Sequence, residues 1–194
     1  MLCTTLRPYN RTCGPTSGGV ARLWIFDADD FNFTQAAADP SGAKPYSAVA
    51  LRPGATAAGG ARMFPIKFEK DEAEYTFKQS RKGCSVKYEH QLEFKLADLS
   101  QLITNWNAAI DAAGCCCGIG IVVQLNSGKI FVAGEKWVNS AAIDIPLEMK
   151  QDGSSGTSGK LKDDFNGETV IIKGDHMRKL YEYSDKVQSI IDLQ

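Results

Sequence analysis

The chain has 194 residues, 43% of them hydrophobic and 23% charged, an ordinary composition for a globular domain with a sizeable core. The formal net charge of -1 excludes an overall basic surface that would grip nucleic acid. No apolar run approaches the roughly 20 residues that span a bilayer, and the N-terminus lacks the apolar centre of a signal peptide. We therefore expect a single domain over residues 1–194, with an N-terminal arm of about residues 1–19, no membrane partner and a cytoplasm-like compartment.

Strand patterns dominate the first half of the chain. Apolar runs and alternating stretches predict strands over residues 22–27, 46–51, 64–70 and 74–80. The most regular alternation predicts a long strand over residues 86–96, whose apolar face holds Val86, Tyr88, His90, Leu92, Phe94 and Leu96. Because His90 falls on the apolar face, we interpret it as a packed, hydrogen-bonded core histidine and not as a catalytic group.

One helix is predicted over about residues 98–113. Asp98 is the expected N-cap, Gln101 completes a capping box, and Gly114 is placed to end the helix. An apolar stripe would pack the helix against a sheet; it consists of Leu99, Leu102, Ile103, Trp106, Ile110 and Ala113.

The remainder of the chain returns to strand patterns. Residues 118–125 and 130–135 predict a hairpin, because Asn126, Ser127 and Gly128 supply turn geometry between two β-branched runs. Further strands are predicted over residues 142–150, 168–174 and 179–185, followed by a short helix or a tail. The fold class is therefore mainly β: a β-sandwich or barrel with one flanking helix and long projecting loops.

A Gly/Ser/Thr-rich segment interrupts the last strands. Residues 153–160 fail the spacing of a phosphate-binding loop, because five residues separate Gly153 from Gly159-Lys160 and no hydroxyl residue follows the lysine. The composition predicts a flexible loop over about residues 152–164, anchored by strands at both ends. The carboxylates of Asp152, Asp163 and Asp164 could form a weak cation site, although their spacing matches no calcium loop and solvated charges explain them as well.

Six cysteines are present, three of them in a row at Cys115, Cys116 and Cys117. Without a secretion signal, free buried thiols are favoured over disulfides, with the triplet at the start of a buried strand. The spacings do not match a zinc site. A nucleophilic pair would have to combine one of these thiols or Cys84 with His90 or His176 as the base.

Four stretches together carry a family resemblance: "FPIKFEKDEAEYTFKQS", "KYEHQLEFKL", "GIGIVVQLNSGKIFVAGE" and "SGTSGKLKDDFNGETVIIKG". Over about residues 60–175 the chain resembles tail tube proteins of tailed bacteriophages, particularly those of Bacteroidetes. The resemblance implies a β-sandwich with a flanking helix and a structural virion protein without catalytic residues, metal or cofactor. It also implies hexameric rings that stack into a tube, assembled in the bacterial cytoplasm, with other tail proteins as partners and DNA passing through the lumen.

The resemblance also gives the Gly/Ser/Thr-rich segment a role as an assembly loop that reaches a neighbouring subunit. The residues expected to act in it are Asp152, Gly153, Ser154, Ser155, Gly156, Thr157, Ser158, Gly159, Lys160, Asp163 and Asp164.

Four other hypotheses stay open at this point. The chain could be another virion component, such as a tail terminator, a head-to-tail connector or a capsid-associated protein. It could be the tube of an injection system that carries no DNA. It could be a non-viral β-sandwich module that binds carbohydrate or protein, or an enzyme that uses a cysteine and histidine pair.

Overall fold

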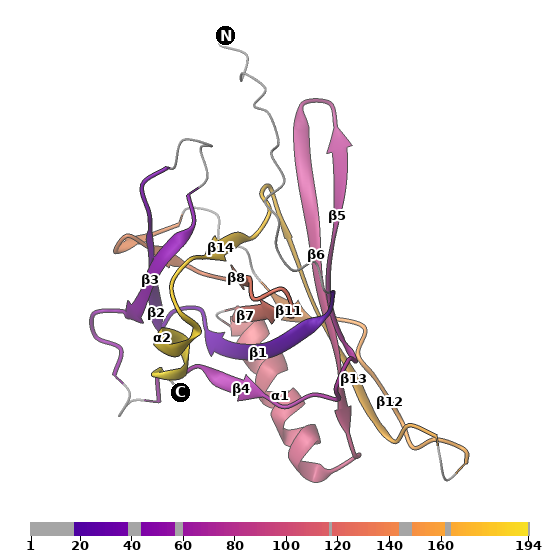
Figure 1. Ribbon diagram of the computed structural model, residues 1–194. Helices are drawn as coiled ribbons and strands as arrows, with labels where there is room; N and C mark the ends of the chain where they lie inside the picture. The colour runs from indigo at the N-terminus through magenta and orange to yellow at the C-terminus, as the bar shows by residue number, and fades with distance from the viewer. Residues whose placement is uncertain are drawn as a thin grey trace.

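The computed structural model describes residues 18–38, 44–56, 60–116, 118–143, 149–161 and 164–193. Its strands form two sheets, with a long helix beside them (Figure 1). Sheet A has nine strands in the order β10-β9-β2-β3-β14-β8-β7-β1-β4. The bounds are β1 Val20–Asp27, β2 Phe31–Gln35, β3 Tyr46–Leu51, β4 Phe64–Ile66, β7 Ile119–Leu125, β8 Ile130–Ala133, β9 Trp137–Val138, β10 Ala141–Ala142 and β14 Tyr181–Tyr183.

Sheet B is antiparallel throughout and has the order β11-β13-β6-β5, with β12 also paired to β13. The bounds are β5 Ala73–Lys82, β6 Ser85–Ala97, β11 Lys150–Gln151, β12 Ser155–Thr157 and β13 Gly167–His176. Helix α1 spans Gln101–Cys116 and helix α2 spans Val187–Ile191. The predicted mainly-β sandwich with a flanking helix is confirmed, and the sheets do not close into a barrel.

Two apolar cores lie on opposite faces of sheet A. Strand β1 contributes to both, since Leu23 and Ile25 belong to the first core and Trp24 and Phe26 to the second. The first core lies against sheet B and α1, and the second includes Ile190 of α2. This double burial explains why β1 and β7 are nearly continuous apolar runs, as strands covered on both faces require.

Sheet A curls strongly around the second core. Phe26 of β1 and Phe31 of β2 pack edge to face with ring centroids 5.3 Å apart, although four strands separate β1 from β2 in the sheet. The strand β2 was missed by the sequence prediction. The sequence does contain the alternation typical of a strand, since Phe31 and Phe33 flank Asn32, and both phenylalanines are buried.

The predicted bounds of the helix were wrong at both ends. Asp98 has a φ of 75°, and it is Ser100 that caps α1, with its hydroxyl 3.4 Å from the amide nitrogen of Ile103. Gly114 lies within the helix, where a Cβ would lie 3.4 Å from the Cβ of Lys150. A side chain there would make ordinary van der Waals contact with β11, and the left-handed residue after the helix is Gly118, with a φ of 78°.

The cysteines were also placed wrongly. Cys115 is exposed in the last turn of α1 and not at the start of a buried strand, and Cys84 is exposed in the turn between β5 and β6. Both are free thiols, so the expectation of free thiols holds for them but the expectation of burial does not. Cys117 and the side chain of Cys116 lie outside the described residues.

The inward orientation predicted for His90 is confirmed, since its side chain is fully buried. Nε2 lies 3.0 Å from the carbonyl oxygen of Arg178, which can only accept, so Nε2 carries a proton. Nδ1 lies 2.8 Å from the hydroxyl of Tyr75, which donates to it when the ring is neutral. Burial lowers the pKa of His90 and keeps the imidazole neutral.

We predict that His90→Lys costs several kcal/mol of unfolding free energy, because an ammonium group would be buried without a partner. The matched control is Gln91→Lys, which places the same charge on the opposite, half-buried face of β6. Urea unfolding followed by tryptophan fluorescence measures both. A His90→Lys variant as stable as Gln91→Lys would contradict the assigned facing of this strand.

We also predict that His90 makes stability depend on pH. The folded pKa lies below the unfolded value of about 6.5, so the unfolded chain takes up a proton that the folded chain does not. Stability from this group is therefore complete above pH 6.5 and declines as the pH falls towards the folded pKa. His90→Gln should show a smaller loss of unfolding free energy between pH 7.5 and pH 5.5 than the parent; equal losses would contradict the prediction.

Candidate assembly surfaces

Two hairpins project from opposite ends of sheet B, as Figure 1 shows. At one end β5 and β6 continue beyond the last β13 pair, His176 with Tyr88. We call residues 78–88 the basic arm. At the other end β12 and β13 extend away from the sandwich, and this hairpin contains the predicted assembly loop.

The basic arm is a two-stranded ribbon with little of its surface covered. Residues 78–85 are all exposed. Gly83, with a φ of 61°, and Cys84 form the two-residue turn between the paired Lys82 and Ser85. The arm has no acidic residue and carries four basic ones, Lys78, Arg81, Lys82 and Lys87. The sequence prediction treated this stretch only as strand and missed its charge.

Part of the Gly/Ser/Thr-rich segment forms a strand, where the sequence predicted a flexible loop. Ser155, Gly156 and Thr157 form β12 and pair with residues 167–169 of β13. The hydroxyl of Ser154 lies 3.0 Å from the amide nitrogen of Ile171, and Asp152 pairs with Lys173 at 3.4 Å. Residues 153–158 therefore add an edge to sheet B, and all of them except Ser154 are exposed.

The far end of the same segment is a turn held by Asp164. Its carboxylate accepts hydrogen bonds from the amides of Leu161 and Lys160, each at 2.8 Å, and these amides lower the pKa of Asp164. Gly159 donates to the Thr157 hydroxyl at 3.2 Å. Asp163 lies outside the described residues.

The described residues show neither the weak cation site nor a pairing of Cys84 with His90. Asp152 pairs with a lysine while Asp164 binds backbone amides, and the described residues contain no group of three or more potential metal ligands. Both ring nitrogens of His90 are occupied, and Cys84 lies in the turn before β6, six residues and roughly 20 Å away. His176 lies at the end of β13, where its Nδ1 is 3.2 Å from the amide nitrogen of Arg178.

Sheet B offers two free edges to another molecule. No described strand pairs along the outer edge of β5 or of β12. The outer face of the sheet is polar and balanced in charge, because the register brings together Lys78, Lys82, Lys87, Lys95 and Lys173 with Glu74, Glu89, Glu93 and Asp175. Unpaired edges of this kind are templates for strand pairing between chains.

A buried polar cluster holds the segment that connects the two sheets. Glu135 is 1% exposed and accepts hydrogen bonds from the hydroxyl of Tyr46, at 2.5 Å, and from the guanidinium of Arg178. That guanidinium also lies over the ring of Tyr181 at 4.2 Å. Burial and the neighbouring Glu135 carboxylate raise the pKa of Tyr46, so it stays a hydrogen-bond donor. No local pattern in the sequence indicated this cluster.

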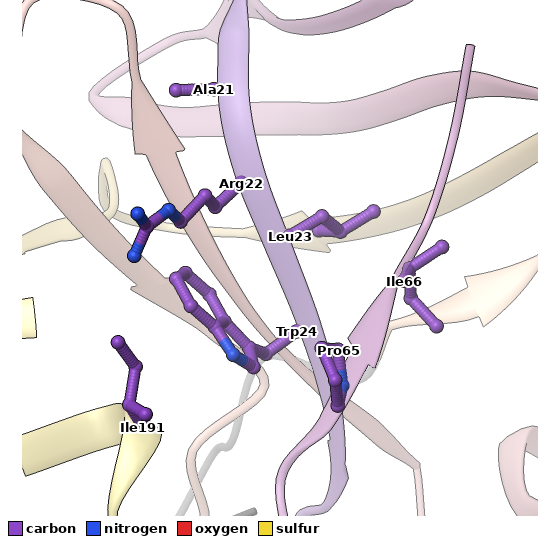
Figure 2. A pocket seen from close by; sticks show the side chains of 7 residues that line it. All are labelled: Ala21, Arg22, Leu23, Trp24, Pro65, Ile66 and Ile191. Atoms are coloured by element: carbon purple, nitrogen blue, oxygen red, sulfur yellow. The ribbon is translucent and has the colours of Figure 1, made fainter. Parts of the chain in front are cut away.

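A hollow of about 280 Å³ opens beside β1 and β4; Figure 2 shows the side chains that line it: Ala21, Arg22, Leu23, Trp24, Pro65, Ile66 and Ile191. The indole N–H of Trp24 has no hydrogen-bond partner among the described groups and is closed to solvent. The hollow therefore offers no reachable polar side-chain group except the Arg22 guanidinium, and we assign it no ligand.

No protein-family model, curated protein or solved structure matches this chain. Neither described helix has the length and apolar character of a membrane-spanning segment. The resemblance to tail tube proteins consequently rests on the sequence stretches themselves.

We predict that Arg178→Met costs roughly 3–5 kcal/mol of unfolding free energy, because it leaves the Glu135 carboxylate buried without a cation. The double variant Arg178→Met/Glu135→Leu should recover most of the loss, since the buried charge goes as well. Urea unfolding of the two variants measures the difference. A single variant with the parent's midpoint would show that the pair does not neutralise a buried charge.

Proposed function

We propose that the protein is a structural subunit of a tailed-bacteriophage virion, a tail tube protein that assembles into stacked hexameric rings around a channel for DNA. The observation that carries the proposal is that the outer edges of β5 and β12 in sheet B pair with no described strand. Pairing of the β5 edge of one copy with the β12 edge of the next is a heterologous contact. Repeated around an axis, such a contact closes a ring.

The outer face of sheet B suits the inner wall of such a ring. It carries lysines and carboxylates in nearly equal number, and several are paired, as in Lys87 with Asp175 at 2.5 Å and Lys95 with Glu72 at 2.7 Å. A continuous basic wall would hold DNA through phosphate contacts, each of which adds salt-sensitive affinity. A balanced wall lets the DNA slide.

The direct test is electron microscopy of the purified protein, together with sedimentation velocity over a range of concentrations. Stacked rings or tubes are the expected result. Single rings that never stack would favour a tail terminator or a connector, and persistent monomers would contradict self-assembly and favour a binding module.

We predict that blocking either edge of sheet B prevents ring formation without unfolding the subunit. Since Lys82 and Ser85 flank a two-residue turn, they form a hydrogen-bonded pair, and the N–H of Gln79 therefore points to the free edge of β5. Gln79→Pro removes that donor and leaves the β5–β6 ladder intact. Gln79→Val, which keeps the N–H, is the matched control.

The second edge is tested by deletion of Ser154–Ser158, which removes β12. These residues belong to neither core, and shortening a surface segment changes the closure entropy only slowly, so the subunit should stay folded. Circular dichroism checks the fold, and microscopy checks the rings. Normal rings from either Gln79→Pro or the deletion variant would contradict edge pairing.

A further inference from the structure

The long hairpin of sheet B is electrically polarised along its strands. Its tip is the basic arm, whose four basic side chains have one carboxylate opposite them across the hairpin, Glu89 facing Lys78. At the opposite end of β5 lies what we call the acidic base, made of Asp71, Glu72, Glu74 and Glu93. The ten residues of β5 run from the base to the turn of the arm, roughly 30 Å, and Lys78, where the arm begins, is four residues from Glu74.

Of the four carboxylates of the acidic base, only Glu72 forms a salt bridge with another described residue. Glu74 and Glu93 are directly opposite each other in the β5–β6 register, an arrangement of like charges that destabilises a sheet. Lys95 lies beside them and pairs with Glu72, and Lys67 and Lys70 line the adjoining hollow together with Asp71. Lys95 and the four carboxylates, together with Gly19 and Ala73, line an open hollow of about 350 Å³.

The basic arm is likewise short of partners. Of its four basic side chains, Lys87 pairs with Asp175, and no salt bridge joins Lys78, Arg81 or Lys82 to another described residue. Beside the arm, Phe77 is 42% exposed, with the ammonium of Lys179 at 4.8 Å from its ring. An exposed ribbon of this kind gains little for its own subunit, because it buries almost no apolar surface.

We propose that the basic arm of one copy docks on the acidic base of another copy, head to tail along the strands of sheet B. This inference rests on the proposed function and names the contact that stacks one ring on the next. Edge pairing joins neighbouring copies in the direction perpendicular to the strands and closes the ring. The arm joins copies in the direction of the strands, from one ring to the next. Because tip and base are different surfaces of the same chain, the contact repeats without closing on itself and builds a column.

Charge complementarity of this kind governs specificity and salt dependence. Stacks should shorten as NaCl rises from 50 to 500 mM, while single rings persist. Arg81→Glu/Lys82→Glu should raise the critical concentration for stacking on the order of tenfold, as reversal of two charges at a complementary contact implies. Adding Glu72→Lys/Glu74→Lys to that variant should restore stacking, whereas Lys186→Glu, an exposed charge reversal outside sheet B, should have no effect.

A cross-link tests the contact without relying on tubes. The native thiol of Cys84 is exposed at the tip of the arm. Glu74→Cys places a second thiol in the acidic base, so a short bismaleimide should join copies into a ladder on a denaturing gel. The ladder should disappear in Glu74→Cys/Cys84→Ser, which separates it from links through other cysteines, and should not form with Lys186→Cys.

The outcomes separate the two proposals. If Arg81→Glu/Lys82→Glu forms tubes as the parent does and no Cys84-dependent ladder appears, the docking of the arm is overturned but the proposed tail tube function is not. A ladder from a protein that forms no rings supports the docking and overturns the tube. Binding of a fluorescent oligonucleotide that is lost in Arg81→Glu/Lys82→Glu and is not restored by Glu72→Lys/Glu74→Lys overturns the docking in favour of a nucleic-acid contact. Monomers without a ladder overturn both.

Discussion

The burial of sheet A on both faces is the constraint on which the rest of the molecule depends. Because β1 sends Leu23 and Ile25 to one core and Trp24 and Phe26 to the other, sheet A forms the middle layer of the fold. Sheet B and α1 cover one side of it, and the second core fills the concave side around which the sheet curls. Sheet A is buried on both faces, whereas sheet B buries only the face that packs on the first core.

Sheet B is therefore free to differ from sheet A in its chemistry. His90, Leu92, Phe94 and Leu96 anchor β6 to the first core, while the residues between them stay charged or polar. Beyond that anchor the β5–β6 hairpin leaves the body and carries its basic arm into solvent. The anchored half contributes apolar burial, whereas the free half is exposed, so substitutions in the arm leave the core unchanged.

The connection between the sheets is held by polar groups rather than by apolar packing alone. The carbonyl of Arg178 accepts a hydrogen bond from His90 of sheet B, and the guanidinium of the same residue binds the Glu135 carboxylate beside sheet A. Such buried pairs contribute little net stability, but they penalise any arrangement that separates them. They therefore fix the position of the segment between β13 and β14 relative to both sheets.

The sequence by itself determined the features that depend on short-range periodicity. The alternation over residues 86–96 was enough to predict which face of β6 is buried, including His90, and the turn at Asn126–Gly128 was enough for the β7–β8 hairpin. Tertiary contacts decided the features that local patterns left open. Ser155–Thr157 form a strand because they pair with β13, and helix α1 continues through Gly114, which lies against Lys150 of β11. The pairing of Glu135 with Arg178 joins residues 43 positions apart, and the charge separation between arm and base exists only once β5 is extended. The alternation of apolar and polar residues in a strand depends on that strand alone. The segments that pair or pack with it are distant in the sequence, and only folding brings them into contact with it.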